Sequence, residues 1–298
     1  MPEMPEVQGL VDFLRRKLIP EDGPPAVVAG LEVASFSVLK TAKVPVQSLA
    51  GLQVQSVDRR GKFLVLEIGG LFLVMHLARA GWLRWSDSLS TARLKPGKGL
   101  IALRVRFADA GTEPGPGGEP GFDLTEAGTR KSLAAYVVES PEEVPGIARL
   151  GPDALELDLA GFKPLLHAHA GQIKGLLRDQ SKIAGIGNAY SDEILHAARL
   201  SPFALANKLD DDAVATLHTT MRHLLRTAIE AASGRPAKEL KDTKRQSLRV
   251  HARTGEACPV CGDTVREVSF ADSSLQYCPT CQTGGKPLAD RRTSKFLK

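Results

Sequence analysis

The stretch Lys182-Ile183-Ala184-Gly185-Ile186-Gly187-Asn188-Ala189-Tyr190-Ser191-Asp192-Glu193 predicts a tight turn that leads into a helix. Gly185 and Gly187 allow the backbone to approach whatever lies above the turn, and Asn188 is suited to cap the helix. The first N–H groups of that helix would form an anion site suitable for a phosphate. A tight connection between two helices with an ordinary cap explains the stretch equally well, so the residues alone leave both interpretations open.

Helical patterns surround this turn from Gly151-Pro152 onward. Residues 165–178 and 189–199 are predicted to form short helices on either side of it. Asp210-Asp211-Asp212 opens a longer helix and Gly234-Arg235-Pro236 ends it. The apolar side of this longer helix consists of Val214, Leu217, Met221, Leu224, Leu225 and Ile229.

The first 140 residues are predicted to be rich in β-strands. The apolar runs 62–68 and 71–76 flank Gly69-Gly70, which predicts a tight hairpin. In residues 102–107 apolar side chains alternate with Ala102, Arg104 and Arg106, a pattern typical of a half-buried strand. The Pro- and Gly-rich run 112–121 predicts a surface loop. An amphipathic helix is expected ahead of the strands, because apolar residues recur at helical spacing after Pro5, namely Val7, Leu10, Val11, Leu14 and Leu18.

All four cysteines lie near the C-terminus and form two Cys-x2-Cys pairs with sixteen residues between them: Cys258, Cys261, Cys278 and Cys281. Such pairs are typical of a tetrahedral four-cysteine zinc site. Two disulfides are the alternative, but a reducing compartment and such short loops disfavour them. We therefore expect one structural zinc ion, followed by a basic tail with Arg291, Arg292, Lys295 and Lys298.

The overall composition is that of a globular protein with a modest positive charge. The 39 basic residues outnumber the 34 acidic ones, giving a formal net charge of +5, which is compatible with a polyanionic partner but shared by many proteins without one. No signal peptide is recognisable, and no apolar run reaches the ~18 residues that a membrane span needs. A cytoplasmic location is the expectation.

The opening Met1-Pro2-Glu3-Met4-Pro5-Glu6-Val7 contains reactive residue types that the start of a helix does not require. Removal of Met1 would leave Pro2 with a secondary amine, a group that attacks an aldehyde carbon to form an iminium. Glu3 would lie within reach to move protons. A helix start accounts for Pro5 and Glu6, since proline and acidic residues favour the first turn, but it does not account for Pro2.

Four motifs taken together resemble one family. They are Pro2-Glu3 with Pro5-Glu6-Val7, Arg59-Arg60-Gly61-Lys62 entering a strand, the Gly185-Ile186-Gly187-Asn188-Ala189-Tyr190 turn, and the four-cysteine finger. In this order they closely resemble the formamidopyrimidine-DNA glycosylase and endonuclease VIII family of base-excision repair enzymes, over essentially the whole chain.

The resemblance implies an α+β multidomain fold. Residues 1–140 would form a catalytic β-sandwich with a leading helix, residues 150–245 a helix-two-turns-helix DNA-binding domain, and residues 246–298 a zinc-finger hairpin and basic tail. The implied activity is a DNA glycosylase with abasic-site lyase activity. The implied partner is damaged double-stranded DNA, bound by a monomeric, nucleoid-associated protein with no membrane contact.

The resemblance also assigns roles to single residues. Pro2 is implied as the Schiff-base nucleophile, Glu3 as the acid/base, and Lys62 as a catalytic-site lysine near the lesion; Glu6 matches an acidic position near the active site. A solvated lysine at a strand start is the alternative for Lys62. Phosphate contacts are implied for His76, Lys174 and Asn188, although a lone histidine after an apolar strand is often structural.

Two positions depart from the family pattern. Ser273 stands where the finger usually presents an arginine, and a serine cannot form a bidentate clamp on a phosphate. Arg79 stands where members acting on oxidised purines place a methionine wedge; its planar group could enter the base stack or bind a phosphate. A non-catalytic or lyase-only relative that binds damaged DNA is therefore the alternative. A zinc-ribbon module of the transcription or translation machinery would leave the first 240 residues unexplained.

Overall fold

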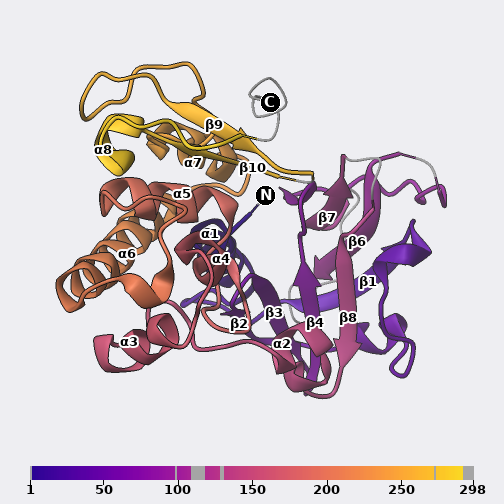
Figure 1. The fold of residues 1–298 in the computed structure, drawn as a ribbon. Helices are drawn as coiled ribbons and strands as arrows, with labels where there is room; N and C mark the ends of the chain where they lie inside the picture. The colour runs from indigo at the N-terminus through magenta and orange to yellow at the C-terminus, as the bar shows by residue number, and fades with distance from the viewer. Residues whose placement is uncertain (1, 98, 109–117, 128–130, 272, 291–298) are drawn as a thin grey trace. The chain divides into compact units, whose positions relative to one another are not determined.

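The computed structural model describes residues 2–97, 99–108, 118–127, 131–271 and 273–290. The chain divides into two compact units (Figure 1). The first comprises Met1–Arg149 and Ala231–Thr243, and the second comprises Leu150–Glu230 and Lys244–Lys298. The fold is of the expected α+β class, and the finger lies in the same unit as the helices that precede it. The predicted domain boundaries 1–140, 150–245 and 246–298 stay a prediction.

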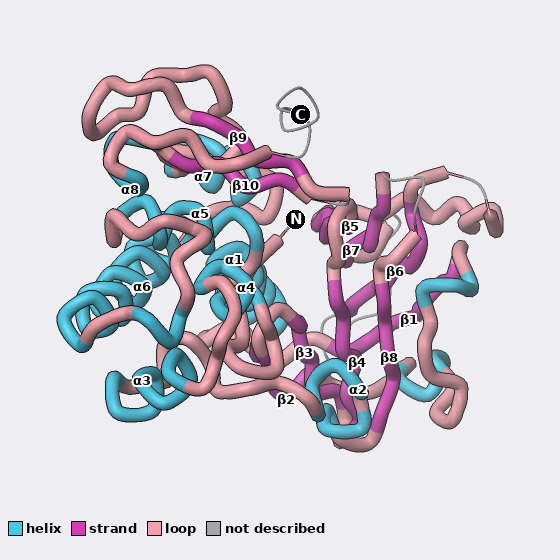
Figure 2. Tube along the Cα trace, in the orientation of Figure 1, coloured by secondary structure: helices cyan, strands magenta, loops and turns pink. Residues whose placement is uncertain are grey.

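The first unit is built on two four-stranded antiparallel sheets (Figure 2). One sheet has the order β1-β6-β7-β5 and consists of β1 (Val27–Val33), β6 (Ile101–Ala108), β7 (Gly121–Glu126) and β5 (Gly81–Ser86). The other has the order β2-β3-β4-β8 and consists of β2 (Val54–Arg60), β3 (Phe63–Ile68), β4 (Leu71–His76) and β8 (Ala134–Val138). The short helix α2 (Pro145–Ala148) follows β8. Buried apolar side chains of both sheets form one core.

The leading helix α1 (Met4–Leu18) confirms the helical periodicity of the N-terminal sequence. Pro5 lies in its first turn, and Arg15, Arg16 and Lys17 lie in its last turn, where basic side chains suit the negative end of the helix. Its five predicted apolar residues are all buried in the core.

Residues 231–243 join the first unit because they pack on α1. Ala232, Ala237 and Leu240 are buried in the same core as the two sheets. A side chain at Gly9 would meet Leu240, whose Cδ2 lies 2.9 Å from the position of a Cβ there. This close approach explains why a segment so distant in sequence belongs to the N-terminal unit.

The predicted hairpin is confirmed. Strands β3 and β4 pair in antiparallel register from Ile68 opposite Leu71 to Phe63 opposite His76. Gly69 and Gly70 both have positive φ, 57° and 81°, which two-residue turns of this type require.

The prediction of a half-buried strand at residues 102–107 is wrong at Arg104. This residue is only 5 % exposed, and its guanidinium forms a bidentate ion pair with Asp123 on the neighbouring strand, at 2.7 and 2.9 Å. The ion pair balances the charge of Arg104, whereas the alternating pattern alone predicted that this side chain faces solvent. Residues 112–117 of the predicted loop lie outside the described residues, as does the basic tail from residue 291.

The helices of the second unit follow the predicted order with one correction. They are α3 (Leu159–His167), α4 (Ile173–Arg178), α5 (Asn188–Ala197) and α6 (Asp211–Ala232). The single helix predicted over residues 165–178 is wrong, because the chain leaves the helix at Ala168 and Gln172 forms an antiparallel bridge with Leu205. The long helix α6 is confirmed.

The turn before α5 departs from the sequence interpretation in one respect. Gly187, in extended conformation, is the N-cap of α5, and Asn188 is its first helical residue. Asn188 donates from Nδ2 to the backbone oxygen of Ser274 at 2.8 Å instead of capping the helix. Gly185 has φ of 105°, so the first glycine is needed for the turn itself.

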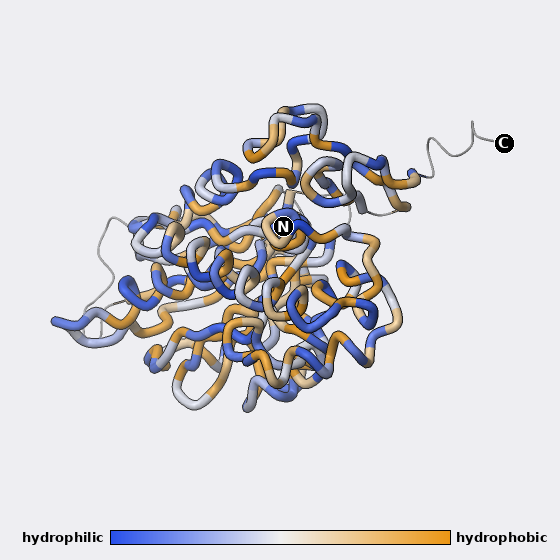
Figure 3. Tube along the Cα trace, turned by 60° about the vertical axis from the view of Figure 1, so that its left-hand side comes forward, coloured by the Kyte–Doolittle hydropathy of each residue, from blue (hydrophilic) through white to orange (hydrophobic). Residues whose placement is uncertain are grey.

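The C-terminal part of the second unit contains α7 (Leu240–Ser247, which begins in the first unit), the hairpin β9 (Arg266–Ser269) and β10 (Ser274–Tyr277), and the short helix α8 (Pro279–Thr283). Hydrophilic and hydrophobic residues intermingle along the helices (Figure 3), as expected of helices that bury one face. Among the described residues, no helix combines the length and apolar character that crossing a membrane requires.

Candidate active site and zinc centre

Two glutamates, Glu3 and Glu6, are buried at the start of α1. Glu3 is 1 % exposed and Glu6 is 3 % exposed, and Pro2 is also buried. The backbone N–H of Glu3 donates to Oε2 of Glu6 at 2.8 Å. The positive end of the helix favours carboxylates at this place. Pro2, Glu3 and Glu6 are therefore all shielded from bulk water at the start of α1.

Lys62 lies in the turn between β2 and β3 and is 9 % exposed. The alternative of a solvated lysine is therefore wrong. The β3–β4 pairing places His76 opposite Phe63, the residue after Lys62, and the rings of Phe63 and His76 lie 4.7 Å apart. Lys62 and His76 consequently share one end of this sheet.

His76 is neutral at ordinary pH. Burial, and then the positive charge of Lys62, lower its pKa from 6.5 to about 4. A neutral imidazole has one N–H to donate and no charge to offer a phosphate. Any contact of His76 with DNA is then a hydrogen bond rather than an ion pair.

We expect His76 to make the first unit less stable in mild acid. The unfolded chain takes up a proton near pH 6.5 and the folded chain only near pH 4, so stability is lost as pH falls through this window. The loss amounts to at most about 3 kcal/mol. An NMR titration of the His76 ring should give a midpoint near 4, and His76→Gln should remove this part of the pH dependence in urea unfolding. A ring that titrates near 6.5 would contradict the expectation.

Arg79 lies in the tight turn between β4 and β5, which passes from one sheet to the other. Its neighbour Ala78 has φ of 51°, an uncommon conformation for a residue other than glycine. Gly81 closes the turn by donating its N–H to the oxygen of Leu77 at 2.9 Å. Arg79 itself is exposed. The turn thus holds an arginine at the surface, and its role as a wedge stays a prediction.

In the second unit, Lys174 is directed to interior partners. It is 5 % exposed, and its Nζ lies 2.6 Å from Oδ1 of Asp192, which is itself fully buried. The same Nζ donates to Oγ of Ser191 at 2.7 Å and to the backbone oxygen of Asn188 at 3.2 Å. The charge of Lys174 is therefore balanced inside the unit, and the predicted phosphate contact is not tested by this arrangement.

One face of α5 connects to the finger segment. Asn188, Asp192 and His196 lie four residues apart and so share this face. Asp192 accepts a 2.7 Å bond from Nδ1 of His251. Glu193 beside it accepts the backbone N–H groups of residues 249–251 at 2.8 to 3.0 Å. The chain just before the first cysteine is thereby tied to α5, a role that sequence reasoning missed.

The four cysteines come together without forming disulfides. The sulfurs of Cys261 and Cys278 lie 3.3 Å apart, and those of Cys258 and Cys281 lie 3.9 Å apart. A tetrahedral zinc ion with bonds of about 2.3 Å separates its thiolates by roughly 3.8 Å. Burial raises the pKa of the Cys278 thiol, and burial raises that of Cys281 to about 11, so a cation is needed to hold both as thiolates. The residues fit one structural zinc ion.

His196 of α5 is a further donor at this centre. Its Nε2 lies 3.3 Å from Sγ of Cys258, and the donor atoms of His196, Cys258, Cys278 and Cys281 all lie within 4.8 Å of one another. The histidine precedes Cys258 by 62 residues, so no spacing rule could have indicated it.

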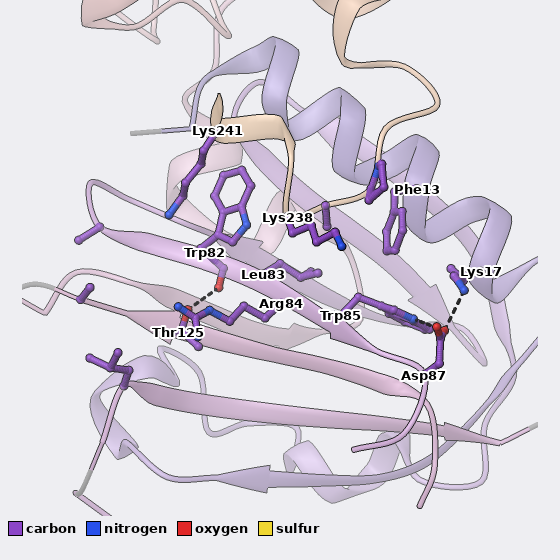
Figure 4. Close-up of a pocket in the computed structure, with 15 residues that line it drawn as sticks. Phe13, Lys17, Trp82, Leu83, Arg84, Trp85, Asp87, Thr125, Lys238 and Lys241 are labelled. Atoms are coloured by element: carbon purple, nitrogen blue, oxygen red, sulfur yellow. Dashed lines mark hydrogen bonds and ion pairs between the residues drawn. The ribbon is translucent and has the colours of Figure 1, made fainter. Parts of the chain in front are cut away.

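The first unit also contains a cavity of about 750 Å³ that the sequence did not indicate (Figure 4). Phe13, Trp82 and Trp85 supply aromatic walls, and Nζ of Lys241 lies 4.6 Å from the centre of the Trp82 ring. Asp87 accepts from Lys17 and from the indole of Trp85, both at 2.8 Å. The walls of this cavity therefore combine aromatic rings with charged side chains of both signs.

Three family models match the chain in the order expected. A formamidopyrimidine-DNA glycosylase N-terminal domain matches residues 1–114, the H2TH domain of that glycosylase matches residues 150–239, and a zinc finger found in FPG and IleRS matches residues 255–284.

Curated proteins and solved structures give the same result. A formamidopyrimidine-DNA glycosylase of Pelotomaculum thermopropionicum is 32 % identical over 95 % of this chain and 99 % of its own. An uncharacterized formamidopyrimidine-DNA glycosylase-like protein of Mycobacterium tuberculosis is 60 % identical over 50 % of this chain and 94 % of its own. The Lactococcus lactis Fpg in complex with DNA containing an abasic site superposes with a TM-score of 0.79, at 26 % identity, over 95 % of this chain and 100 % of that one.

Proposed function

We propose, because this chain belongs to the formamidopyrimidine-DNA glycosylase family, that it excises a damaged base from DNA and then cleaves the strand through a Schiff base on Pro2. Enzymes of this family are DNA glycosylases for damaged bases, and so is this protein. The strand cleavage and the covalent step are the proposed part. The observation that supports them best is the burial of Glu3 and Glu6 beside Pro2.

The proposed reaction starts once Met1 has been removed. The secondary amine of Pro2 attacks C1′ of a nucleotide that has turned out of the duplex. The bond between C1′ and the base breaks, and the base leaves with a proton. The bond between C1′ and O4′ then breaks as O4′ takes up a proton, and the opened sugar is held as an iminium on Pro2. Loss of a C2′ proton expels the 3′ phosphate, and a second elimination expels the 5′ phosphate.

Glu3 is proposed as the group that moves protons in these steps. It adjoins Pro2 in sequence and is shielded from bulk water, which strengthens its interactions with reacting atoms. Lys62 is proposed to assist near the lesion. It is shielded in the same way, and its charge acts on His76. The zinc ion is structural in this proposal, because four thiolates leave no open coordination position.

The DNA contacts are proposed as follows. His76 and Asn188 each offer a polar hydrogen to a phosphate, and Arg79 enters or borders the gap left by the turned-out base. For Lys174, the close pairing with Asp192 favours a positioning role at the first turn of α5. A protein that acts on DNA in this way would be located at the chromosome.

Borohydride trapping tests the proposal. Wild-type protein whose Met1 is shown by mass spectrometry to be absent is mixed with duplexes that contain an oxidised purine, an oxidised pyrimidine or an abasic site. Reduction should yield a covalent adduct, and the DNA should be attached to the peptide that begins at Pro2. An adduct on another residue, or none with any duplex, would refute the covalent step.

A second candidate is a relative that binds damaged DNA and cuts only abasic sites or none. It is favoured by Ser273, which precedes β10 in the finger hairpin and whose backbone oxygen accepts the N–H of Phe270 at 2.7 Å. A serine there supplies no charge to hold phosphates around the lesion. Trapping on abasic duplexes alone would select the lyase-only protein, and binding without trapping would select the non-catalytic one.

A further inference from the structure

The zinc centre has more donors than a zinc ion uses. Structural zinc takes four ligands in a tetrahedron. Among the described residues, five side chains reach the centre: Cys258, Cys261, Cys278, Cys281 and His196. One of the five side chains must therefore stay unbound to the ion while the other four coordinate it.

We propose that His196 is a reserve ligand of this centre. While the four cysteines hold zinc, Nε2–H of His196 donates to the thiolate of Cys258. When the Cys261 thiolate is lost, Nε2 binds the ion and leaves a site of three cysteines and one histidine. Nε2 loses its proton before it binds the ion and Nδ1 gains one, so the imidazole stays neutral.

His196 already lies close to the ion site that it would enter in the exchange. Nε2 of His196 lies 3.3 Å from Sγ of Cys258, which is a hydrogen-bond distance for sulfur. A nitrogen bonded to zinc at about 2.0 Å lies roughly 3.6 Å from a thiolate of the same tetrahedron. The two distances to Cys258 differ by a few tenths of an ångström, and the donor atoms of His196, Cys258, Cys278 and Cys281 already lie within 4.8 Å of one another.

Burial identifies Cys261 as the ligand that is lost first. Cys258 is 2 % exposed and Cys278 is fully buried, whereas Cys261 is exposed. Electrophiles and oxidants reach an exposed thiolate before buried ones. His196 is 2 % exposed, so the substitute ligand is protected where the cysteine is not.

The other ring nitrogen explains why His196 is a reserve and not a primary ligand. Nδ1 is buried and has no hydrogen-bond partner among the described residues. In the present tautomer Nδ1 is an acceptor without a proton. If Nε2 bound the ion, Nδ1 would carry the proton and become a buried donor without a partner, which costs free energy. Zinc-bound histidines ordinarily donate their second N–H to a partner. The cysteine is therefore preferred while it is available.

The ring is also held in place relative to the cysteines. Glu193, one turn before His196 on α5, binds the backbone N–H groups of residues 249–251. On the other side, Gln282 of α8 donates to the oxygen of Leu200 at 2.9 Å and accepts from the N–H of Cys278 at 2.9 Å. These contacts join α5 to the segment before the first cysteine pair, and the segment after α5 to the second pair, so His196 is held close to the ion site.

Metal analysis of purified full-length variants tests the proposal without an activity assay. Cys261→Ala should retain its zinc, and Cys261→Ala with His196→Phe should lose it. His196→Phe alone should retain zinc but release it to a chelator about tenfold faster or more, as expected when a hydrogen bond to a ligand is removed. His218→Phe is the matched control, because His218 is a buried histidine of the same unit that bonds to the oxygen of Leu157. Combined with Cys261→Ala, it should leave the zinc in place.

Cobalt substitution identifies the ligands directly. In Cys261→Ala, the charge-transfer absorption should lose one thiolate contribution, and the ligand-field bands should move to shorter wavelength as imidazole replaces sulfur. The spectrum of His196→Phe should match that of the wild type. Equal metal content in Cys261→Ala with and without His196→Phe, whether retained or lost, would overturn the proposal. Borohydride trapping by the wild type does not bear on this result, so the two proposals fail separately.

Discussion

A chain in which the Pro2 nitrogen stays acylated should bind damaged DNA and cut none of it. A leucine inserted between Met1 and Pro2 blocks removal of the first residue and keeps that nitrogen in an amide. The lone pair of an amide is delocalised into the carbonyl, so it cannot attack C1′. We expect strand scission to fall by about 10⁴-fold or more, and the borohydride adduct to disappear.

The controls for this experiment come from the same chain. Pro5→Ala changes a proline in the first turn of α1 but leaves the terminus intact, and should still form the adduct. The affinity of the extended chain for a duplex with an abasic site should stay within a few-fold of the wild type. Scission by a chain whose Pro2 is shown by mass spectrometry to be acylated would refute the role of the amine.

The second large effect is expected at Lys174. Lys174→Met should destabilise the second unit by about 3–5 kcal/mol, because it leaves the fully buried carboxylate of Asp192 without its 2.6 Å partner. His251 at 2.7 Å remains as a partner of Asp192, and its side chain is 22 % exposed. Urea unfolding followed by a probe in the second unit measures the change.

Two variants separate the buried charge from other causes. Lys174→Met combined with Asp192→Leu removes both charges and should recover much of the lost stability. Lys163→Met removes an equally short pair, with Asp211, whose two side chains are 41 % and 71 % exposed. This control should change stability little, because solvent screens the pair. Equal effects of Lys174→Met and Lys163→Met would show that burial of Asp192 does not matter.

Some of the candidate site could be predicted because its signals are local in sequence. Pro2 and Glu3 are neighbours, and each Cys-x2-Cys pair spans one short loop, so the candidate nucleophile and the metal site needed no tertiary information. The positions of Lys174 and Asn188 were predicted by resemblance, but the direction of their side chains was not. Lys174 faces Asp192 and Asn188 bonds to Ser274, and both contacts depend on how α5 meets its neighbours.

The sequence by itself determined α1, the β3–β4 hairpin, α6 and the grouping of four cysteines, because periodicity, turn residues and ligand spacing act over a few residues. Only the tertiary structure decided that Arg104 is buried against Asp123, that Leu240 packs on α1, and that His196 reaches Cys258. Each of these contacts joins residues far apart in the chain. No local pattern encodes such a contact, because the partner's charge or volume enters only when the elements pack.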